Sequence, residues 1–403
     1  MKIVVLKFGG TSVGTIEKIK KVASIIGNYR KKNYKVIVVS SAMSGVTNDL
    51  IKKSRQISKN FSESEYDVLV SSGEQVACSL IAGRLKYNGF KSRSWLGWQI
   101  PILTQGPHKN SRINQINKNK IISYLKEGGI PIITGFQGMN NDQRITTIGR
   151  GGSDASAIML AKFFKAQRCV IYTDVEGVYT TDPNKFNKAK KIKVISYEEM
   201  LEMASLGAKV MQPVSIQDAR LNRIDIEVKS SFIKKSGTLI TKKSNIINSK
   251  IVTGITSTYN DSKVTLVGVK DKPGVAAMIF EPLGKNQVNI DMVIQNVSSD
   301  GKTTDLTFTI KRDELNKTLK VIKENKDVKI DQISHNKKVA KISIVGAGMV
   351  TTPGVSYKMF KALSEENINI LAISTSEIKI SIIIDEANTV NAVKKLHKTF
   401  ELN

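Results

Sequence analysis

The sequence predicts an α/β protein in which a domain with a mostly parallel sheet precedes two smaller units of the ferredoxin-like βαββαβ type. Three observations support this fold class. Apolar runs of β type alternate with amphipathic helical stretches over residues 1–245. Glycine-rich or small polar segments follow several of these runs directly. From residue 264 onward the chain repeats itself, so the last third contains two copies of one unit.

The expected elements of the first domain, residues 1–245, can be read from this periodicity. Strands are expected over residues 3–6, 36–39, 130–133, 170–172 and 226–228, and helices over 16–29, 48–58, 74–85 and 197–204. Ligands of such sheets bind beyond the carboxyl ends of the strands. Candidate ligand segments lie at these ends, over residues 7–10, 40–43, 135–138 and 173–174.

The first glycine-rich segment, Lys7–Gly14, follows the first apolar run. It combines one lysine with bare backbone at Gly9 and Gly10, which can approach an anion closely, and this is typical of phosphate binding. The chain lacks the G-x-x-x-x-G-K-[ST] pattern of a P-loop. A glycine pair taken alone would also fit an ordinary turn.

The second segment, Gly149–Asp154, precedes a helical stretch over residues 155–161. The N–H groups and the positive end of this helix would face negative charge. Asp154 stands where a dinucleotide fingerprint needs its third glycine, so that type of site is excluded. The two segments together predict a nucleotide site facing an acidic substrate.

The C-terminal repeat predicts two units, over residues 264–338 and 340–403. Each unit has the order strand, Pro-Gly loop, helix, strand, strand, helix, which is the ferredoxin-like order. Such a pair can be structural padding, a dimerisation module or a site for an amino-acid carboxylate at a helix start. The matched segments, 78 to 80 residues apart, are Val264–Gly268 with Ile342–Gly346, Pro273–Val275 with Pro353–Val355, and Asn289–Asp291 with Asn369–Leu371.

Length and composition set the class of protein. The 403 residues suffice for two or three domains. No uncharged run approaches the ~20 residues of a membrane span, and the start lacks a signal-peptide cleavage region, so we expect a cytoplasmic protein without a membrane partner. Cys78 and Cys169 lie in apolar runs without metal-ligand spacing, which predicts buried free thiols, no disulfide and no structural metal.

The formal net charge of +27 raises the alternative of a nucleic-acid-binding regulator. The lysines are dispersed along the chain and no nucleic-acid-binding motif accompanies them. We therefore expect no nucleic-acid partner, and a steep fall of affinity with salt would distinguish the alternative. The charge would instead attract anionic small molecules.

Five segments occur in the order and spacing of the aspartate kinases, and the chain resembles that family over essentially its whole length. They are Lys7–Val13, Ser71–Glu74, Gly149–Asp154, Tyr172–Pro183 and Gly207–Lys209. The resemblance implies a three-layer amino-acid-kinase (carbamate-kinase-like) domain followed by two ACT domains, with no homoserine dehydrogenase portion. Acetylglutamate, uridylate and carbamate kinases share the catalytic fold but lack this tandem tail.

The resemblance implies transfer of the ATP γ-phosphoryl group to the β-carboxylate of L-aspartate, the first step towards lysine, threonine and methionine. This reaction brings two anions together, so positioning and charge neutralisation carry most of the catalysis. Mg²⁺ is expected to arrive with ATP and to need few protein ligands. We expect no separate metal site.

The family's motifs assign roles to individual residues here. Lys7 would neutralise the β- and γ-phosphates while Gly9 and Gly10 donate N–H groups to them, and Asp154 would orient Lys7. Arg150 would clamp the substrate carboxylate and Glu74 would hold the substrate ammonium. Taken alone, Glu74 would also fit a charge at a helix start. The remaining substrate-binding residues would be Thr47, Gly151, Gly152 and Ser153.

The nucleotide site would include residues from the first segment and from the loop at 172–183. Asn184 stands where many relatives have arginine, which puts one phosphate or ribose contact in question. The expected nucleotide-binding residues are Lys7, Phe8, Gly9, Gly10, Ser41, Thr173, Asp174, Tyr179, Asp182, Asn184 and Lys209.

The ACT domains imply feedback control by lysine, threonine or both, and a homo-oligomer built through these domains. In the second ACT domain, residues 340–403, Val350–Pro353 stands at the positions of Lys272 and its neighbours, so this domain is assigned to the subunit interface instead. A catalytically silent amino-acid sensor is the alternative; intact Lys7, Glu74, Arg150 and Asp154 argue against it. The expected effector-binding residues are Asp271, Lys272, Pro273, Gly274, Val275, Ala276, Asn289, Ile290, Asp291, Gln295 and Asn296.

Overall fold

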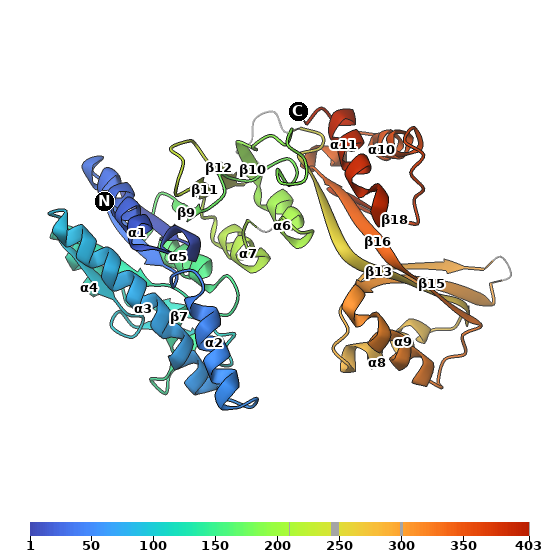
Figure 1. Ribbon diagram of the computed structural model, residues 1–403, viewed down its shortest axis with the longest axis horizontal. Helices are drawn as coiled ribbons and strands as arrows, with labels where there is room; N and C mark the ends of the chain where they lie inside the picture. Colours follow the sequence, from blue (N-terminus) through green and yellow to red (C-terminus); the bar gives the residue numbers. More distant parts are fainter. Residues whose placement is uncertain (209, 243–249, 299–300, 403) are drawn as a thin grey trace. The chain divides into compact units, whose positions relative to one another are not determined.

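The computed structural model describes residues 1–208, 210–242, 250–298 and 301–402 (Figure 1). The chain forms two compact units. Met1–Tyr179 and Lys191–Asn248 make the first, and Thr180–Lys190 with Ser249–Asn403 make the second. Within the described part of the chain, no helix is both long and apolar enough for a membrane span.

The first unit is built on an eight-stranded sheet. Its strand pairs are parallel except for β11 with β12, which confirms the predicted mostly parallel sheet. The central strands are almost wholly buried runs of valine, isoleucine and leucine, as expected where helices cover both faces. The strand order is β10 (Val194–Ser196), β12 (Thr238–Thr241), β11 (Ile226–Ser230), β9 (Cys169–Thr173), β1 (Ile3–Phe8), β2 (Lys35–Ser40), β6 (Ile130–Thr134) and β3 (Ser92–Trp95).

Helices on both faces make this unit a three-layer structure. α1 (Ile16–Lys31) and α3 (Glu63–Tyr87) share one hydrophobic core with alternate residues of the central strands. α5 (Gly152–Phe163) packs against β1, β2 and β9 from the other face. The remaining elements are α2 (Val46–Ile57), α4 (Asn119–Lys126), α6 (Tyr197–Ser205), α7 (Pro213–Asn222) and a small sheet of β5 (Arg112–Ile116), β4 (Ile102–Gln105), β7 (Gln137–Met139) and β8 (Ile145–Thr147).

The predicted strands and helices of this unit are confirmed in kind, and most bounds agree within two residues. The exception is the helix predicted over residues 74–85, which begins at Glu63. Glu74 therefore lies in the interior of α3, so its interpretation as a helix-start charge is wrong. The helix start was missed because the first turns, Glu63–Val68, carry mostly polar residues.

The second unit contains a six-stranded sheet and confirms the two βαββαβ repeats (Figure 1). The long strands β13 (Gly254–Lys270) and β16 (Gln332–Val345) pair along both repeats, so the two repeats share one continuous sheet. Each repeat has its own hydrophobic core beneath its helices. The other elements are α8 (Val275–Lys285), β14 (Ile290–Val297), β15 (Thr303–Lys311), α9 (Leu315–Glu324), α10 (Val355–Ser364), β17 (Ala372–Ser376), β18 (Lys379–Asp385) and α11 (Thr389–Thr399).

The segment Thr180–Lys190 packs within the second unit. The N–H of Ile255 donates to the carbonyl oxygen of Thr180 at 2.7 Å. The hydroxyl of Thr180 lies 2.8 Å from Nε2 of His397, a fully buried residue of α11. The ring of Phe186 packs edge-on against the same histidine. This segment is therefore a structural part of the second unit.

Candidate functional site

Lys7 and Asp154 form a nearly buried ion pair in the first unit. Lys7 lies near the carboxyl end of β1 and Asp154 lies in the first turn of α5. The lysine Nζ is 2.6 Å from Oδ1 of Asp154, and the two side chains are only 11% and 12% exposed. Charges this buried need a partner. The fold thus brings the two glycine-rich segments of the sequence to one place.

The backbone around Gly9 and Gly10 differs in part from the expectation. The N–H of Gly9 donates to the carbonyl oxygen of Tyr172 at 3.1 Å, because the ladder between β1 and β9 continues past Phe8. The predicted donation from Gly9 to a phosphate is therefore wrong for this conformation. Gly10 meets its requirement for a bare backbone, since a Cβ there would lie 2.9 Å from the carbonyl oxygen of Ala42.

Glu74 is a buried carboxylate of which only one oxygen is hydrogen-bonded to a described residue. Its Oε1 accepts a hydrogen bond from the N–H of Ala42 at 3.0 Å. Its Oε2 is buried and has no hydrogen-bond partner among the described residues. Burial raises the pKa of Glu74 to about 7, and the N–H of Ala42 offsets only part of that rise. Such a carboxylate suits a cationic ligand group.

The approach of α3 to the segment after β2 depends on Gly73. A Cβ at Gly73 would lie 2.8 Å from Cβ of Ala42. A larger residue would push α3 away and break the contact of Glu74 with Ala42. Thr47, in the first turn of α2 after the left-handed Gly45, and Ser41, directly after β2, lie on the same segment.

A tight turn carries Arg150 at the start of α5. Gly149 and Gly151 have φ values of 79° and 76°, a left-handed conformation that favours glycine. Gly152 opens the helix, and Ser153 behind it is buried. Arg150 is exposed and forms no ion pair with any described residue. Its guanidinium is therefore available at a helix end that favours anions.

The residues assigned to the nucleotide lie in both units. Thr173 ends β9, and its hydroxyl donates to Oδ1 of Asp174 at 3.0 Å. Tyr179 is the last residue of the first of the two segments, Met1–Tyr179, that make up the first unit. Asp182 and Asn184 belong to the second unit, where the N–H of Asn184 donates to Oδ1 of Asp182 at 3.0 Å. Lys209 lies outside the described residues.

The residues assigned to an effector lie on one repeat of the second unit. Gly274, with φ 89°, precedes α8, and the predicted Lys272–Ala276 segment forms this helix start. Gln295 and Asn296 are exposed on β14, an edge strand. Asp291 on the same strand pairs with Lys341, whose side chain is only 7% exposed. Asp291, one of the expected effector-binding residues, thus already contacts a cation of the chain.

Two groups of buried polar residues near the site escaped the sequence interpretation. The hydroxyls of Ser12 and Ser231 lie 2.5 Å apart and join the first glycine segment to the loop after β11. Asp67, fully buried on α3, accepts hydrogen bonds from the loop at residues 106–111. No motif marks these residues. The only signal for Asp67 is an acid placed among core positions of a helix.

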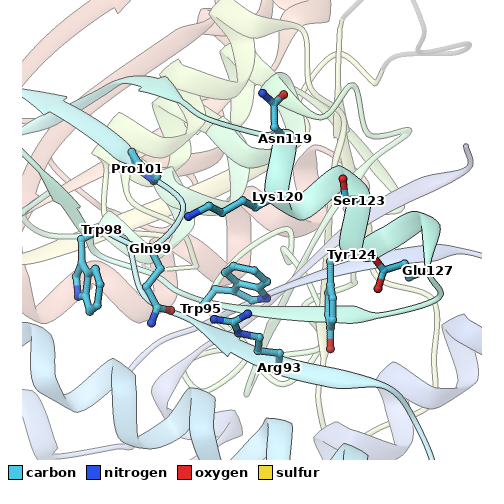
Figure 2. Close-up of a pocket in the computed structure, with 10 residues that line it drawn as sticks. All are labelled: Arg93, Trp95, Trp98, Gln99, Pro101, Asn119, Lys120, Ser123, Tyr124 and Glu127. Atoms are coloured by element: carbon cyan, nitrogen blue, oxygen red, sulfur yellow. The ribbon is translucent and has the colours of Figure 1, made fainter.

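A cavity of about 760 Å³ in the first unit lies apart from these residues (Figure 2). No residue predicted for the site lines it. The guanidinium of Arg93 lies 4.0 Å from the ring centroid of Trp95. In Figure 2, Trp98 and Tyr124 lie on opposite sides of the cavity. The cavity lacks a buried charged pair like Lys7 and Asp154, so it is not the candidate site.

Cysteine and metal-ligand chemistry adds nothing to this site. Cys78 and Cys169 are both buried free thiols, as predicted. Burial raises the pKa of each thiol above its ordinary value, so both stay protonated. The described residues contain no group of three or more histidine, cysteine or acidic side chains arranged to hold a metal ion.

Family models match both parts of the chain. Residues 2–230 match the amino acid kinase family, and residues 264–325 and 342–400 match the ACT domain. The aspartate kinase of Pseudomonas putida is 44% identical over 405 residues, covering 100% of this chain and 98% of that protein.

Two solved structures of Escherichia coli aspartokinase III are also similar, each at 25% identity. The complex with aspartate and ADP (R-state) has a TM-score of 0.77 and covers 98% of this chain and 99% of its own. The complex with lysine and aspartate (T-state) has a TM-score of 0.80 and covers 99% and 100%. From its catalytic segments through its two ACT domains, this chain belongs to the aspartate kinases of the amino acid kinase family.

Proposed function

We propose that this chain transfers the γ-phosphoryl group of ATP to the β-carboxylate of L-aspartate and releases ADP and 4-phospho-L-aspartate, in the cytoplasm. The buried pair of Lys7 with Asp154 carries the proposal, because it holds the ammonium of Lys7 in place near the end of β1. The similarity to an aspartokinase solved with aspartate and ADP supports it. The product would be the first intermediate towards lysine, threonine and methionine.

The site chemistry follows from charge. A carboxylate oxygen of aspartate attacks the γ-phosphorus while the bond to the β-phosphate oxygen breaks. Negative charge then grows on the leaving phosphate, and the ammonium of Lys7 stabilises it. Mg²⁺ bound to ATP would supply further charge neutralisation, and the exposed carboxylate of Asp174 is a suitable ligand because Mg²⁺ takes one or two carboxylates besides phosphates.

Aspartate itself would be held at its two other charged groups. The free Oε2 of Glu74 would take the α-ammonium, which satisfies a buried oxygen that otherwise has no partner. Arg150 would take the α-carboxylate in a bidentate contact. The β-carboxylate is then left to face the phosphoryl group, so the length of the substrate side chain decides which acid reacts.

The substrate assignment predicts ADP release that depends on both ATP and aspartate. With Mg-ATP fixed, aspartate is expected to support a higher kcat/KM than glutamate, which is one methylene longer, and than N-acetylglutamate, which lacks the ammonium for Glu74. A coupled ADP assay on the purified chain measures this. Faster turnover of either other acid would contradict the substrate, and absence of ADP release with all three would favour the silent amino-acid sensor.

The second unit would carry feedback control by lysine, threonine or both, and would join subunits. The helix start at Gly274 offers N–H groups to an effector carboxylate, and Gln295 offers an exposed amide. The similar aspartokinase III was solved with lysine. Exposed Val293, Val297 and Ile373 lie on the edge strands β14 and β17, which supports a homo-oligomer through this unit.

Feedback control predicts that lysine, threonine or their mixture lowers the aspartate kinase rate. Gln295→Ala is expected to weaken the inhibition about 5-fold or more while leaving the uninhibited rate unchanged, because a coupling of ~1–3 kcal/mol corresponds to ~5–150-fold. Gln332→Ala, an exposed glutamine on β16, is the matched control and should keep wild-type inhibition. If neither amino acid changes the rate or the melting temperature, the proposal of feedback control is contradicted, and the proposal of aspartate kinase activity is unaffected.

A further inference from the structure

Asp67 is a fully buried carboxylate that three neighbouring residues contact through hydrogen bonds. It lies on α3 with no exposed surface. Nδ1 of His108 lies 2.7 Å from its Oδ2, and the N–H of Lys109 donates to both oxygens at 3.1 and 3.2 Å. The hydroxyl of Thr147 donates to Oδ1 at 2.5 Å. These charge-assisted hydrogen bonds offset the cost of burying the carboxylate.

The donors come from two segments that flank the turn carrying Arg150. Thr147 ends β8, two residues before Gly149. Lys109 lies in the loop at 106–111, whose Ser111 N–H donates to the carbonyl oxygen of Thr147 at 2.9 Å. Asp67 therefore ties that loop and the end of β8 to α3.

The loop also abuts the turn itself. A Cβ at Gly149 would lie 3.1 Å from both the carbonyl oxygen of Lys109 and Oδ1 of Asn110. The turn thus rests directly on backbone that Asp67 holds. Arg150 follows at once, is exposed, and has no ion pair with a described residue to fix its side chain. Its placement depends on the backbone beneath it.

We propose that Asp67 is a positioning residue, which fixes the turn Gly149–Gly151 and thereby holds Arg150 where it meets the α-carboxylate of aspartate. The inference rests on the proposed function and names a residue outside the family's motifs quoted above. Asp67 does not touch substrate. Losing its hydrogen bonds therefore weakens aspartate binding while the Lys7 pair and the nucleotide contacts remain.

The test distinguishes positioning of Arg150 by Asp67 from a general contribution of Asp67 to the stability of the fold. Thr147→Val removes one donor to Asp67 and keeps the shape of the side chain, whereas Thr147→Ser keeps the hydroxyl. We expect Thr147→Val to raise KM for aspartate about 5-fold or more, with KM for ATP and kcat within twofold of wild type. Thr147→Ser should restore KM for aspartate, and Asp67→Asn should raise it more strongly than Thr147→Val.

Glu63→Gln is the matched control. The Glu63 carboxylate contacts Nζ of Lys109 at the surface without involving Asp67, so this variant should behave as wild type. If Thr147→Val leaves KM for aspartate unchanged, or raises both KM values in parallel, positioning by Asp67 is overturned, and this variant decides even if Asp67→Asn does not fold. A wild-type chain without aspartate kinase activity would instead overturn the proposed function.

Discussion

Replacing Lys7 by alanine is expected to lower kcat for aspartate phosphorylation by about 100- to 1,000-fold or more. The ammonium is the buried positive charge next to the proposed phosphoryl site, and losing one such stabilising group costs about 3–4 kcal/mol in the transition state. Steady-state kinetics with saturating Mg-ATP and aspartate measure the effect. Activity within twofold of wild type would remove Lys7 from the mechanism.

The same substitution leaves Asp154 buried without its cation, so a loss of activity through unfolding has to be separated from a loss of catalysis. An uncompensated buried charge costs roughly 3–5 kcal/mol of stability. The double variant Lys7→Met with Asp154→Asn removes both charges. We expect it to regain most of the melting temperature and to stay inactive; recovery of activity together with stability would show that Lys7 acts only through folding.

Replacing Glu74 by glutamine is expected to abolish efficient use of aspartate and, at pH 8, to stabilise the fold. Burial raises the pKa of Glu74 from 4.5 to about 7, so the folded chain binds a proton more tightly than the unfolded chain. Wild-type stability therefore falls as pH rises from 4.5 to 7 and stays low above it. Glutamine mimics the protonated acid and should gain about 3 kcal/mol at pH 8 and much less at pH 5.

Denaturant unfolding at the two pH values, together with KM for aspartate, tests this prediction. In the wild type, KM for aspartate should also rise as pH falls below 7, because only the ionised Glu74 attracts the substrate ammonium. Glu127→Gln, which removes a surface carboxylate paired with Lys91, should show neither effect. Equal stability of Glu74→Gln and wild type at pH 8 would contradict the burial argument.

The architecture could be predicted from the sequence because apolar residues recur along the chain in regular patterns. Apolar runs such as Val36–Val39 are buried on both faces, and parallel strands of this kind leave an unbroken hydrophobic pattern. The repeat spacing likewise predicted both units of the second sheet. The continuation of β13 through both repeats was missed, because residues 256–263 are mostly polar and show no apolar strand pattern, although several of them are buried.

The residues of the candidate site could be predicted only where they lie in recognisable sequence motifs. Lys7, Arg150 and Asp154 stand in recognisable segments, and the fold brings Lys7 to Asp154. The bond of Gly9 to Tyr172 and the placement of Asp67 depend on strands and loops that meet only in three dimensions. No local pattern states that a carboxylate on α3 will receive donors from residues 108, 109 and 147.

The segment Thr180–Lys190 also has a consequence for synthesis on the ribosome. It packs against His397 of α11, which is translated about 200 residues later. At ~5–20 residues per second, that interval lasts roughly 10–40 s. During it, the buried side chains of Thr180 and Thr181 have no helix to cover them, although the strands on either side already exist. The second unit is therefore the last part of this chain to close, and its closure buries residues made before the first unit was complete.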